Sequence, residues 1–286
     1  MRFDSRDFVV PHGGRHVLRG RPTEVEPFYE SKDDFRDILS KHVEQLSELQ
    51  EMLYASKQYA LLVVFQGMDT AGKDGTIRHV MSGVDPQGVQ VFSFGRPSDA
   101  ELRHEFLWRE TLCLPERGRI GVFNRSYYEE VVVVRVHPEL LRRQGIEGAP
   151  TTRTWQERFE SIVEFERHLH RNGTRVLKFF LHLSKQEQRR RLLARLDDPH
   201  KHWKFNVGDI EERRHWQKYM SAYEACLSAT SRAHAPWYVV PADDKRNARL
   251  IVSQAIIDEL AALKLRYPDV SAARRRELRK VRRRLE

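Results

Sequence analysis

Cysteine is scarce in this sequence, and long apolar runs are missing from it. The 286 residues include two cysteines, Cys113 and Cys226, which lie far apart without metal-ligand spacing. We therefore expect them to be packing residues in a reducing compartment. No segment approaches the roughly 18 apolar residues that span a bilayer, and the first residues lack the apolar core of a signal peptide. A cytoplasmic globular protein is the expected class.

Charge of one sign is in excess only at one end of the chain. Lys and Arg number 50 against 41 Asp and Glu, a net charge of +9. Residues 271–286 hold eight basic and two acidic side chains, a net of +6, so the other 270 residues carry +3. Such a body lacks a uniformly basic surface, and we expect no nucleic-acid partner. The tail is either an anion-binding arm or a solvated, partly helical run of charge; its composition favours the solvated run.

Five short β-like runs alternate with helical periodicity along most of the chain. After an irregular or extended start, Ser31 and Asp34 resemble a capping box and predict a helix to about Ser56. Helical patterns also cover Thr154–Arg171 and Ala248–Leu265. The expected strands are Leu61–Phe65, Val89–Phe94, Arg119–Phe123, Arg175–Leu183 and Trp237–Val240. This alternation predicts a single α/β fold: a three-layer α/β/α core with a five-stranded, mostly parallel sheet.

A glycine-bearing loop follows the first expected strand. Its sequence, GMDTAGKD, starts at Gly67 and matches the phosphate-loop (Walker A) pattern G-x-x-x-x-G-K at every fixed position except the last, where Ser or Thr is usual. A strand leads in and a helix leads out from about Gly75, so backbone N–H groups face an anion. A plain glycine turn is the alternative, which the spacing and the lysine disfavour. The candidate phosphate-binding residues here are Gly67, Ala71, Gly72, Lys73, Asp74 and Gly75.

Two aspartates in this loop need a counter-ion. Asp69 and Asp74 would repel bound phosphates in a partly dry site. Mg²⁺, or Mn²⁺ in its place, resolves the conflict, because a carboxylate can hold the metal where the Ser/Thr hydroxyl usually does. Asp74 has a plain alternative as a favourable charge in the first turn of a helix. We expect Asp69 to be a catalytic and metal-binding residue.

Polar residues also end the third expected strand. Asn124 occupies the position where phosphate-loop enzymes usually carry an acid, and it offers only a carbonyl oxygen. The acid must then be Asp69, Glu129 or Glu130. Arg125 follows at the carboxyl end of the strand, where open parallel sheets bind ligands. It can clamp a phosphate and take up charge during transfer, the alternative being a surface salt bridge.

An arginine-rich segment, residues 184–216, follows the fourth expected strand. Phosphate-loop kinases commonly carry a mobile helical lid at this place, and its arginines close over phosphates. Arg191 and Arg195 lie four apart on one helix face, and with Lys204 they are candidate phosphate ligands. Arg189 and Arg190 are expected to be solvated, and Trp203 and Phe205 to pack the lid. The density of cations suggests a polyanion longer than a triphosphate.

Several separate motifs resemble the polyphosphate kinase type 2 family. They are GMDTAGKDGTI, FNRSYYEEVVVVRVHP, LKFFLHLSKQEQRRRL, DDPHKHWKF, GDIEERRHW and APWYVVPADDK. The resemblance covers roughly 30–268, so we divide the chain into an arm (1–30), a phosphate-loop kinase domain (31–268, lid about 184–216) and a basic tail (269–286). It implies a thymidylate-kinase-like core with a helical lid, and reversible phosphoryl transfer between inorganic polyphosphate and adenine or other purine nucleotides. Mg²⁺ and a cytoplasmic homodimer or homotetramer are also implied.

The resemblance assigns roles residue by residue. The family's loop aspartate and lysine fall on Asp69 and Lys73, and its strand-end arginine on Arg125. Members that favour ADP or GDP have Asp-Arg-Ser-Trp-Tyr-Asn where this chain has the segment 124–129, NRSYYE. The variant resembles the class III subgroup, which phosphorylates both AMP and ADP. Because the acid is absent from position 124, Glu129 becomes the candidate for metal or acceptor positioning.

Two rival functions are left open by the sequence. One is an ATP-dependent nucleotide or nucleoside kinase on the same core, which differs in its phosphoryl donor. The other is a non-catalytic polyanion- or nucleic-acid-binding protein that uses the tail and the lid, which predicts salt-sensitive binding without turnover. The loop lysine favours an enzyme.

Overall fold

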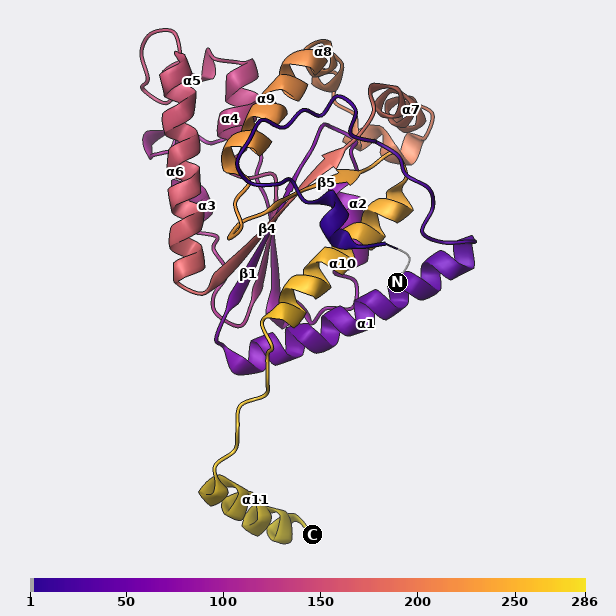
Figure 1. Cartoon of the computed structure of the whole chain (residues 1–286), viewed down its shortest axis with the longest axis vertical. Coiled ribbons are helices and arrows are strands. Elements are labelled where there is room, and N and C mark those ends of the chain that lie inside the picture. Colours follow the sequence, from indigo (N-terminus) through magenta and orange to yellow (C-terminus); the bar gives the residue numbers. More distant parts are fainter. Residues whose placement is uncertain (1–2) are drawn as a thin grey trace.

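A five-stranded parallel sheet forms the middle layer of the molecule (Figure 1). The computed structural model describes residues 3–286. The strand order is β2-β3-β1-β4-β5, and every neighbouring pair is parallel. The strands are β1 (Ala60–Gln66), β2 (Val89–Ser93), β3 (Ile120–Asn124), β4 (Thr174–His182) and β5 (Trp237–Pro241). Each lies within one residue of the range predicted from the sequence, so the expected α/β sheet is confirmed.

Helices cover both faces of the sheet, as the three-layer prediction requires. One face carries α1 (Lys32–Ser56), α2 (Lys73–Val80) and α10 (Lys245–Ala262). The opposite face carries α4 (Glu129–Val136), α6 (Thr152–Arg171) and α9 (Trp216–Thr230). The remaining helices are α3 (Trp108–Thr111), α5 (Leu140–Arg143), α7 (Lys185–Leu196), α8 (Gly208–Arg214) and α11 (Ala272–Leu285). Short 3-10 turns are Ser5–Phe8, Pro86–Gly88, Glu101–Arg103 and Pro199–Lys204.

The central strand shows why the chain needs both layers. All of β1 is buried, because both of its faces are covered, as in parallel sheets generally. Leu61 and Val63 belong to the cluster under α1 and α10, whereas Leu62 and Val64 belong to the cluster under α4, α6 and α9. The period-2 alternation of side chains therefore divides a continuous apolar run between two cores.

Helix starts follow local hydrogen bonds more than apolar periodicity. Ser31 accepts a hydrogen bond from the Asp34 N–H at 3.1 Å, as the predicted capping box requires. The reciprocal bond differs: the Asp34 carboxylate accepts from the N–H of Glu30 at 2.7 Å. The helix predicted for 248–265 begins and ends three residues earlier; it begins at Lys245 because the Asp244 side chain caps its first turn.

The N-terminal arm lies against the body rather than free in solvent. The Val10 N–H donates to the Trp237 carbonyl at 2.8 Å, and the Leu18 N–H donates to the Glu224 carboxylate at 2.8 Å. The Phe3 ring stacks on Phe28 with centroids 4.3 Å apart. The first two contacts attach an irregular segment to β5 and α9, and the Ser5 hydroxyl attaches it to α10 by donating to Asp258. Among residues 3–286, no helix has the length and apolarity to cross a membrane.

Candidate active site

The glycine loop lies at the centre of the sheet's carboxyl edge, between β1 and α2. At Gly67 the backbone φ is +152°, and a Cβ there would lie 2.9 Å from the Leu181 carbonyl oxygen. Gly72 has φ +105° and caps α2, which begins at Lys73, two residues earlier than predicted. Both positions need glycine, since a side chain would be strained or would clash. The first turn of α2 therefore presents its N–H groups to the loop.

Thr70 gives independent support for an anion site in this loop. Its φ is +66°, a conformation that β-branched residues rarely adopt. Its Oγ1 is buried and has no hydrogen-bond partner in the described part of the chain. Backbone strain and an unpaired buried hydroxyl each cost free energy of folding. Both are typical of sites where a bound ligand compensates for that cost.

Lys73 lies folded under its own loop. Its ammonium group donates to the Gly67 carbonyl at 2.7 Å and approaches the Met68 carbonyl at 3.5 Å. Burial lowers the pKa of Lys73, and the nearby Arg125 guanidinium lowers it further. Phosphate oxygens at the loop would replace both carbonyls as partners and favour the charged form.

Arg125 and Asp69 form an ion pair across the loop, at 2.9 Å between Nη2 and Oδ1. Arg125 has φ +63°, a strained value for an arginine, and its N–H donates to the Phe65 carbonyl at 3.0 Å, which fixes it beside β1. Burial opposes the charge on Arg125, but the Glu129 and Asp69 carboxylates outweigh it and raise its pKa. Burial raises the pKa of Glu129, although Arg125 and Lys73 act in the opposite direction. Four charged groups thus face one another at the strand ends.

The four expected metal ligands do not form one cluster. Asp69 pairs with Arg125, whereas the Asn124 amide donates to Asp74 Oδ1 at 2.8 Å. In residues 3–286, no set of three or more His, Cys, Asp or Glu side chains converges in a way that could hold a metal. Magnesium commonly keeps several waters and takes only one or two protein carboxylates beside substrate phosphates. The oxygens of Asp69 fit that sparse donor set.

A cavity of about 460 Å³ opens beside the loop. Met68, Asp69, Arg125 and Glu129 line its inner end. Its other walls combine cationic, acidic and apolar side chains: Arg96, Arg109, Arg143, His137, Glu130, Glu139, Glu212, Pro97, Leu102, Val133, Leu140, Tyr219 and Tyr223. This volume and this mixture suit a ligand with one anionic end and one aromatic end.

Glu130, which the sequence left as a candidate metal-binding acid, makes structural hydrogen bonds instead. Its Oε2 accepts from Arg158 at 2.9 Å and from the Gln144 amide at 2.6 Å. Both Glu130 and Arg158 are buried. Glu130 therefore braces α4 against α6, and Glu129 is the neighbouring carboxylate that faces Lys73 and Arg125.

Arg191 lies under the loop instead of above it, which corrects its expected role as a phosphate ligand. Its guanidinium donates to the carbonyls of Thr70 and Ala71 at 2.9 and 3.0 Å. Further bonds reach the carbonyls of Ala242 and Asp243 and the Glu187 carboxylate. All five N–H groups are used, so none is left for phosphate. Arg191 ties the loop to the segment after β5.

Gln188 has a similar supporting role that the sequence analysis missed. Its amide donates to the Asp69 carbonyl at 3.1 Å and its oxygen accepts from Arg213 at 2.7 Å. Gln188 and Arg191 are three residues apart, so a shared face of α7 was visible in the sequence. What could not be seen was that this face meets the loop.

The other lid residues are arranged more loosely. Arg195 lies 3.7 Å from the Asp209 carboxylate, and Lys204 lies over the Trp203 ring at 4.8 Å. Trp203 is 79% exposed, so the expectation that it packs the lid is wrong. Asp209 is partly buried, and burial together with the facing Asp69 charge raises its pKa. The lid segment therefore brings both signs of charge to the site.

A second hollow, of about 520 Å³, is lined by residues of α1, of the end of α2 and of α10. Its charged lining is basic: Lys32, Arg36, Arg246, Arg249 and His79. Arg249 Nε is buried without a partner in the described residues, and burial lowers the pKa of Arg249. A Cβ on Gly75 would lie 3.8 Å from the Arg249 guanidinium, which connects this basic groove to the first turn of α2.

Comparison with known proteins gives consistent similarities. The family model described as Polyphosphate kinase 2 (PPK2) matches residues 29–268. The ADP-polyphosphate phosphotransferase of Rhodopseudomonas palustris is 56% identical, over 100% of this chain and 99% of the relative. The AMP/ADP-polyphosphate phosphotransferase of Meiothermus ruber is 45% identical, over 93% and 96%. The crystal structure of Polyphosphate Kinase 2 from Arthrobacter aurescens TC1 aligns with a TM-score of 0.85 at 41% identity, covering 94% of each chain.

Proposed function

This chain belongs to the polyphosphate kinase 2 family, and we propose that it transfers phosphoryl groups reversibly between inorganic polyphosphate and the adenine nucleotides AMP and ADP. One observation carries the proposal: the loop with Lys73 adjoins a nucleotide-sized cavity, and Arg249 connects the first turn of the following helix to a basic groove without acidic lining. An acceptor can then approach the loop through the cavity, and a donor from the groove beside α2. An ATP-dependent kinase needs an adenine site on the donor side, where the groove has arginines beside Phe35, Leu39 and Val43.

The 460 Å³ cavity is the proposed acceptor site. Its inner end meets Asp69 and Arg125, where a terminal phosphate would lie, and its apolar outer wall suits a base. Arg109 is held in place there: it donates to the Gly95 carbonyl at 2.9 Å and pairs with Glu110 at 3.0 Å. A guanidinium fixed in this way recognises phosphate oxygens in a defined geometry.

The basic groove beside α2 is the proposed donor path. Lys245 begins α10 near this groove, and its pKa is lowered by burial and by the charges of Arg191 and Arg249, although Glu187 opposes the shift. Mutual repulsion of this kind disfavours the groove when it is empty and favours it when a polyanion neutralises it. The lid cations Arg195 and Lys204 are proposed to contribute from the other side, whereas Arg191 is not.

The chemistry asks the protein for alignment more than for proton transfer. The second pKa of a phosphate monoester is about 6, so the attacking phosphate is largely dianionic near neutral pH. No general base is then needed. What remains is to hold two polyanions in line and offset their repulsion. Lys73 and Arg125 are proposed to take up charge on the transferred group, and Thr70 and the loop N–H groups to orient it.

Kinases of this family generally need a divalent metal ion, and we propose Mg²⁺. Asp69 is the residue proposed to hold it, with Glu129 as the candidate second carboxylate and the hydrogen-bonded pair Asp74 and Asn124 as further candidates. When bound, the ion supplies positive charge shared between donor and acceptor phosphates.

We propose that AMP and ADP are both acceptors, as the variant segment 124–129 suggests. The experiment is an assay with AMP, Mg²⁺ and polyphosphate as sole donor, run beside one with ATP as donor. ADP and then ATP should form with polyphosphate. ADP formed from AMP only when ATP is supplied would favour the rival nucleotide kinase.

A cytoplasmic location and a homodimer or homotetramer are further proposals. Light scattering of the purified chain would give its oligomeric state, and fractionation of its cells would give its location.

A further inference from the structure

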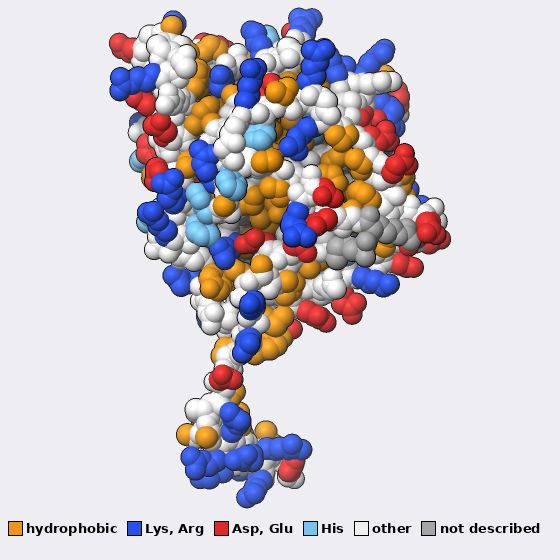
Figure 2. Space-filling model, viewed as in Figure 1, with side chains coloured by type: hydrophobic (Ala, Val, Ile, Leu, Met, Phe, Trp, Pro, Cys, Tyr) orange, Lys and Arg blue, Asp and Glu red, His pale blue; other side chains and the backbone are white. Residues whose placement is uncertain are grey.

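The C-terminal helix α11 stands apart from the rest of the molecule. Ser271 caps it by accepting from the Arg274 N–H at 3.1 Å, and every residue from 266 to 286 is exposed. Figures 1 and 2 show it projecting from the body at the end of an extended linker, with blue side chains gathered on it. It also lies outside the family match at 29–268. Neither the fold nor the proposed active site uses it.

The basic residues of α11 are divided unequally around the helix. Two of them have acidic partners, Arg274 with Glu277 and Arg282 with Glu286, each at 2.7 Å. The other six have no ion pair within residues 3–286. At 100° per residue these six lie on one half of the helix, opposite a narrow apolar stripe. The six are Arg275, Arg276, Arg279, Lys280, Arg283 and Arg284, and the stripe is Leu278, Val281 and Leu285.

A cationic face of this kind is unfavourable by itself. Like charges one turn apart weaken a helix, and every residue of α11 is exposed, so burial does not compensate for this. A linear polyanion removes the repulsion, releases its own counter-ions, and can pair its oxygens with arginine N–H groups. Binding of a flexible chain of phosphates would therefore stabilise this helix.

We propose that α11 is a second binding site for inorganic polyphosphate, separate from the active site. The identity of the polyanion rests on the proposed function. The helix holds long chains by its cationic face and keeps them near the enzyme, so that chain ends reach the glycine loop more often.

The position of α11 predicts which lengths of polyphosphate it helps to bind. Helix α10 starts beside the loop and runs 18 residues, about 27 Å, toward the opposite edge of the sheet. The linker 263–271 adds at most about 30 Å. Only a long chain can contact α11 and the active site together, and tethering then raises its effective concentration at the loop. Tripolyphosphate is too short to do so.

Three variants test the proposal: one truncated chain and two full-length chains with substitutions. The first ends at Pro268, the second replaces the six unpaired cations by Gln, and the third replaces Leu278, Val281 and Leu285 by Ala. Binding of long-chain polyphosphate and of tripolyphosphate is measured by calorimetry over a series of salt concentrations. The first two variants should bind the long chain about 10-fold or more weakly and with a smaller salt slope. Tripolyphosphate affinity and the KM for AMP should not change, and the third variant should match the parent.

Several results would overturn the proposal. Unchanged long-chain affinity in both the truncated and the Gln variant would do so directly. Loss of long-chain binding in the apolar-stripe variant alone would assign the helix to self-association or to a membrane surface. Full-length chain that binds anionic vesicles or duplex DNA through α11, but not polyphosphate, would assign it to those partners. Binding is measured without turnover, so absence of phosphoryl transfer to AMP would refute the proposed function and not this site.

Discussion

Single residues at the site show that charge is held in place by the backbone. Arg125 and Thr70 both have positive φ values, and Gly67 is packed against the Leu181 carbonyl. Such conformations cost about 1–3 kcal/mol each and persist only where the surroundings enforce them. The loop is therefore preorganised, which is the main way in which electrostatic catalysis lowers a barrier.

Replacing Lys73 by Met, or Asp69 by Asn, should lower turnover about 100-fold or more, because each removes one preorganised charge. The measurement is initial-rate kinetics with saturating AMP and polyphosphate, with circular dichroism to check folding. Lys41→Met, on the exposed side of α1, is the matched control and should keep full turnover. Near-normal turnover in Lys73→Met would remove that lysine from the mechanism.

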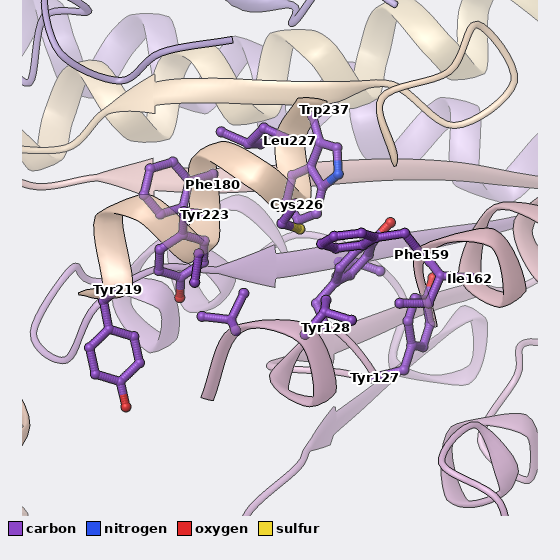
Figure 3. Close-up of a cluster of buried hydrophobic side chains, with 14 of the residues drawn as sticks. Tyr127, Tyr128, Phe159, Ile162, Phe180, Tyr219, Tyr223, Cys226, Leu227 and Trp237 are labelled. Carbon is purple, nitrogen blue, oxygen red and sulfur yellow. The ribbon is translucent and has the colours of Figure 1, made fainter. Parts of the chain in front are cut away.

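A fully buried ion pair contacts the two tyrosines that follow β3. Lys178 Nζ lies 2.6 Å from Glu166 Oε2 and also donates to the hydroxyl of Tyr128 and to the Thr230 carbonyl. Tyr127 and Tyr128 both donate to Glu166 Oε1. Figure 3 shows the surrounding cluster, which includes Tyr127, Tyr128, Cys226, Phe159 and Trp237. The two tyrosines are part of the motif that carries Arg125, so this network helps to position it.

Lys178→Met should destabilise the fold by about 3–5 kcal/mol, because Glu166 would be left charged and buried. Urea denaturation gives the free energy of unfolding. The double variant with Glu166→Gln should lose less than the sum of the two single losses, since the pair acts as one unit. A loss under about 1 kcal/mol in the single variant would contradict this account.

Glu110 should make stability depend on pH. Burial raises its pKa from 4.5 to about 7, although Arg109 opposes the shift. The folded state therefore holds this proton where the unfolded state has lost it, so the free energy of unfolding falls as pH rises from about 4.5 to 7. Glu110→Gln should reduce this decrease in the free energy of unfolding by about 3 kcal/mol at most. Urea titrations at pH 5 and pH 8 test it, and an identical fall in parent and variant would contradict it.

At the scale of elements, the sheet could be predicted and the packing of α7 could not. Apolar runs with polar turns located each strand to within one residue, because burial on both faces leaves a continuous signal. The sequence also placed Arg191 on a helix face, but not the neighbour of that face. The direction of Arg191 depends on tertiary contacts with Thr70, Ala71 and Ala242, which lie 51 to 121 residues away in the chain. The separation of the metal candidates was hidden for the same reason.

The support role of α7 predicts a contrast between adjacent arginines. Arg191→Gln should destabilise the fold by roughly 2 kcal/mol or more, since it leaves buried carbonyls unpaired, and it should lower turnover through the displaced loop. Arg190→Gln, on the exposed side of the same helix, should change stability by less than about 0.5 kcal/mol. Thermal melts and kinetics of both variants are the test. Equal effects would show that α7 does not support the loop.

Over the whole molecule, basic side chains gather in a few regions although the net charge of most of the chain is small. The net +3 outside the last sixteen residues is small, yet cations gather in the groove beside α2, in the lid and on α11. The groove and the lid lie near a loop at the carboxyl edge of a parallel sheet, where such folds bind ligands, whereas α11 projects from the far end of the molecule (Figure 1). A modest total charge is thus compatible with a polyanionic substrate.

The most direct measurement of the central claim is phosphorus NMR of AMP mixed with the enzyme, Mg²⁺ and long-chain polyphosphate, with no nucleoside triphosphate added. The account predicts that β-phosphate signals of ADP, and later ATP signals, appear in the parent while polyphosphate is consumed, and that Lys73→Met shows neither. AMP and polyphosphate signals that stay unchanged with the parent enzyme would contradict it.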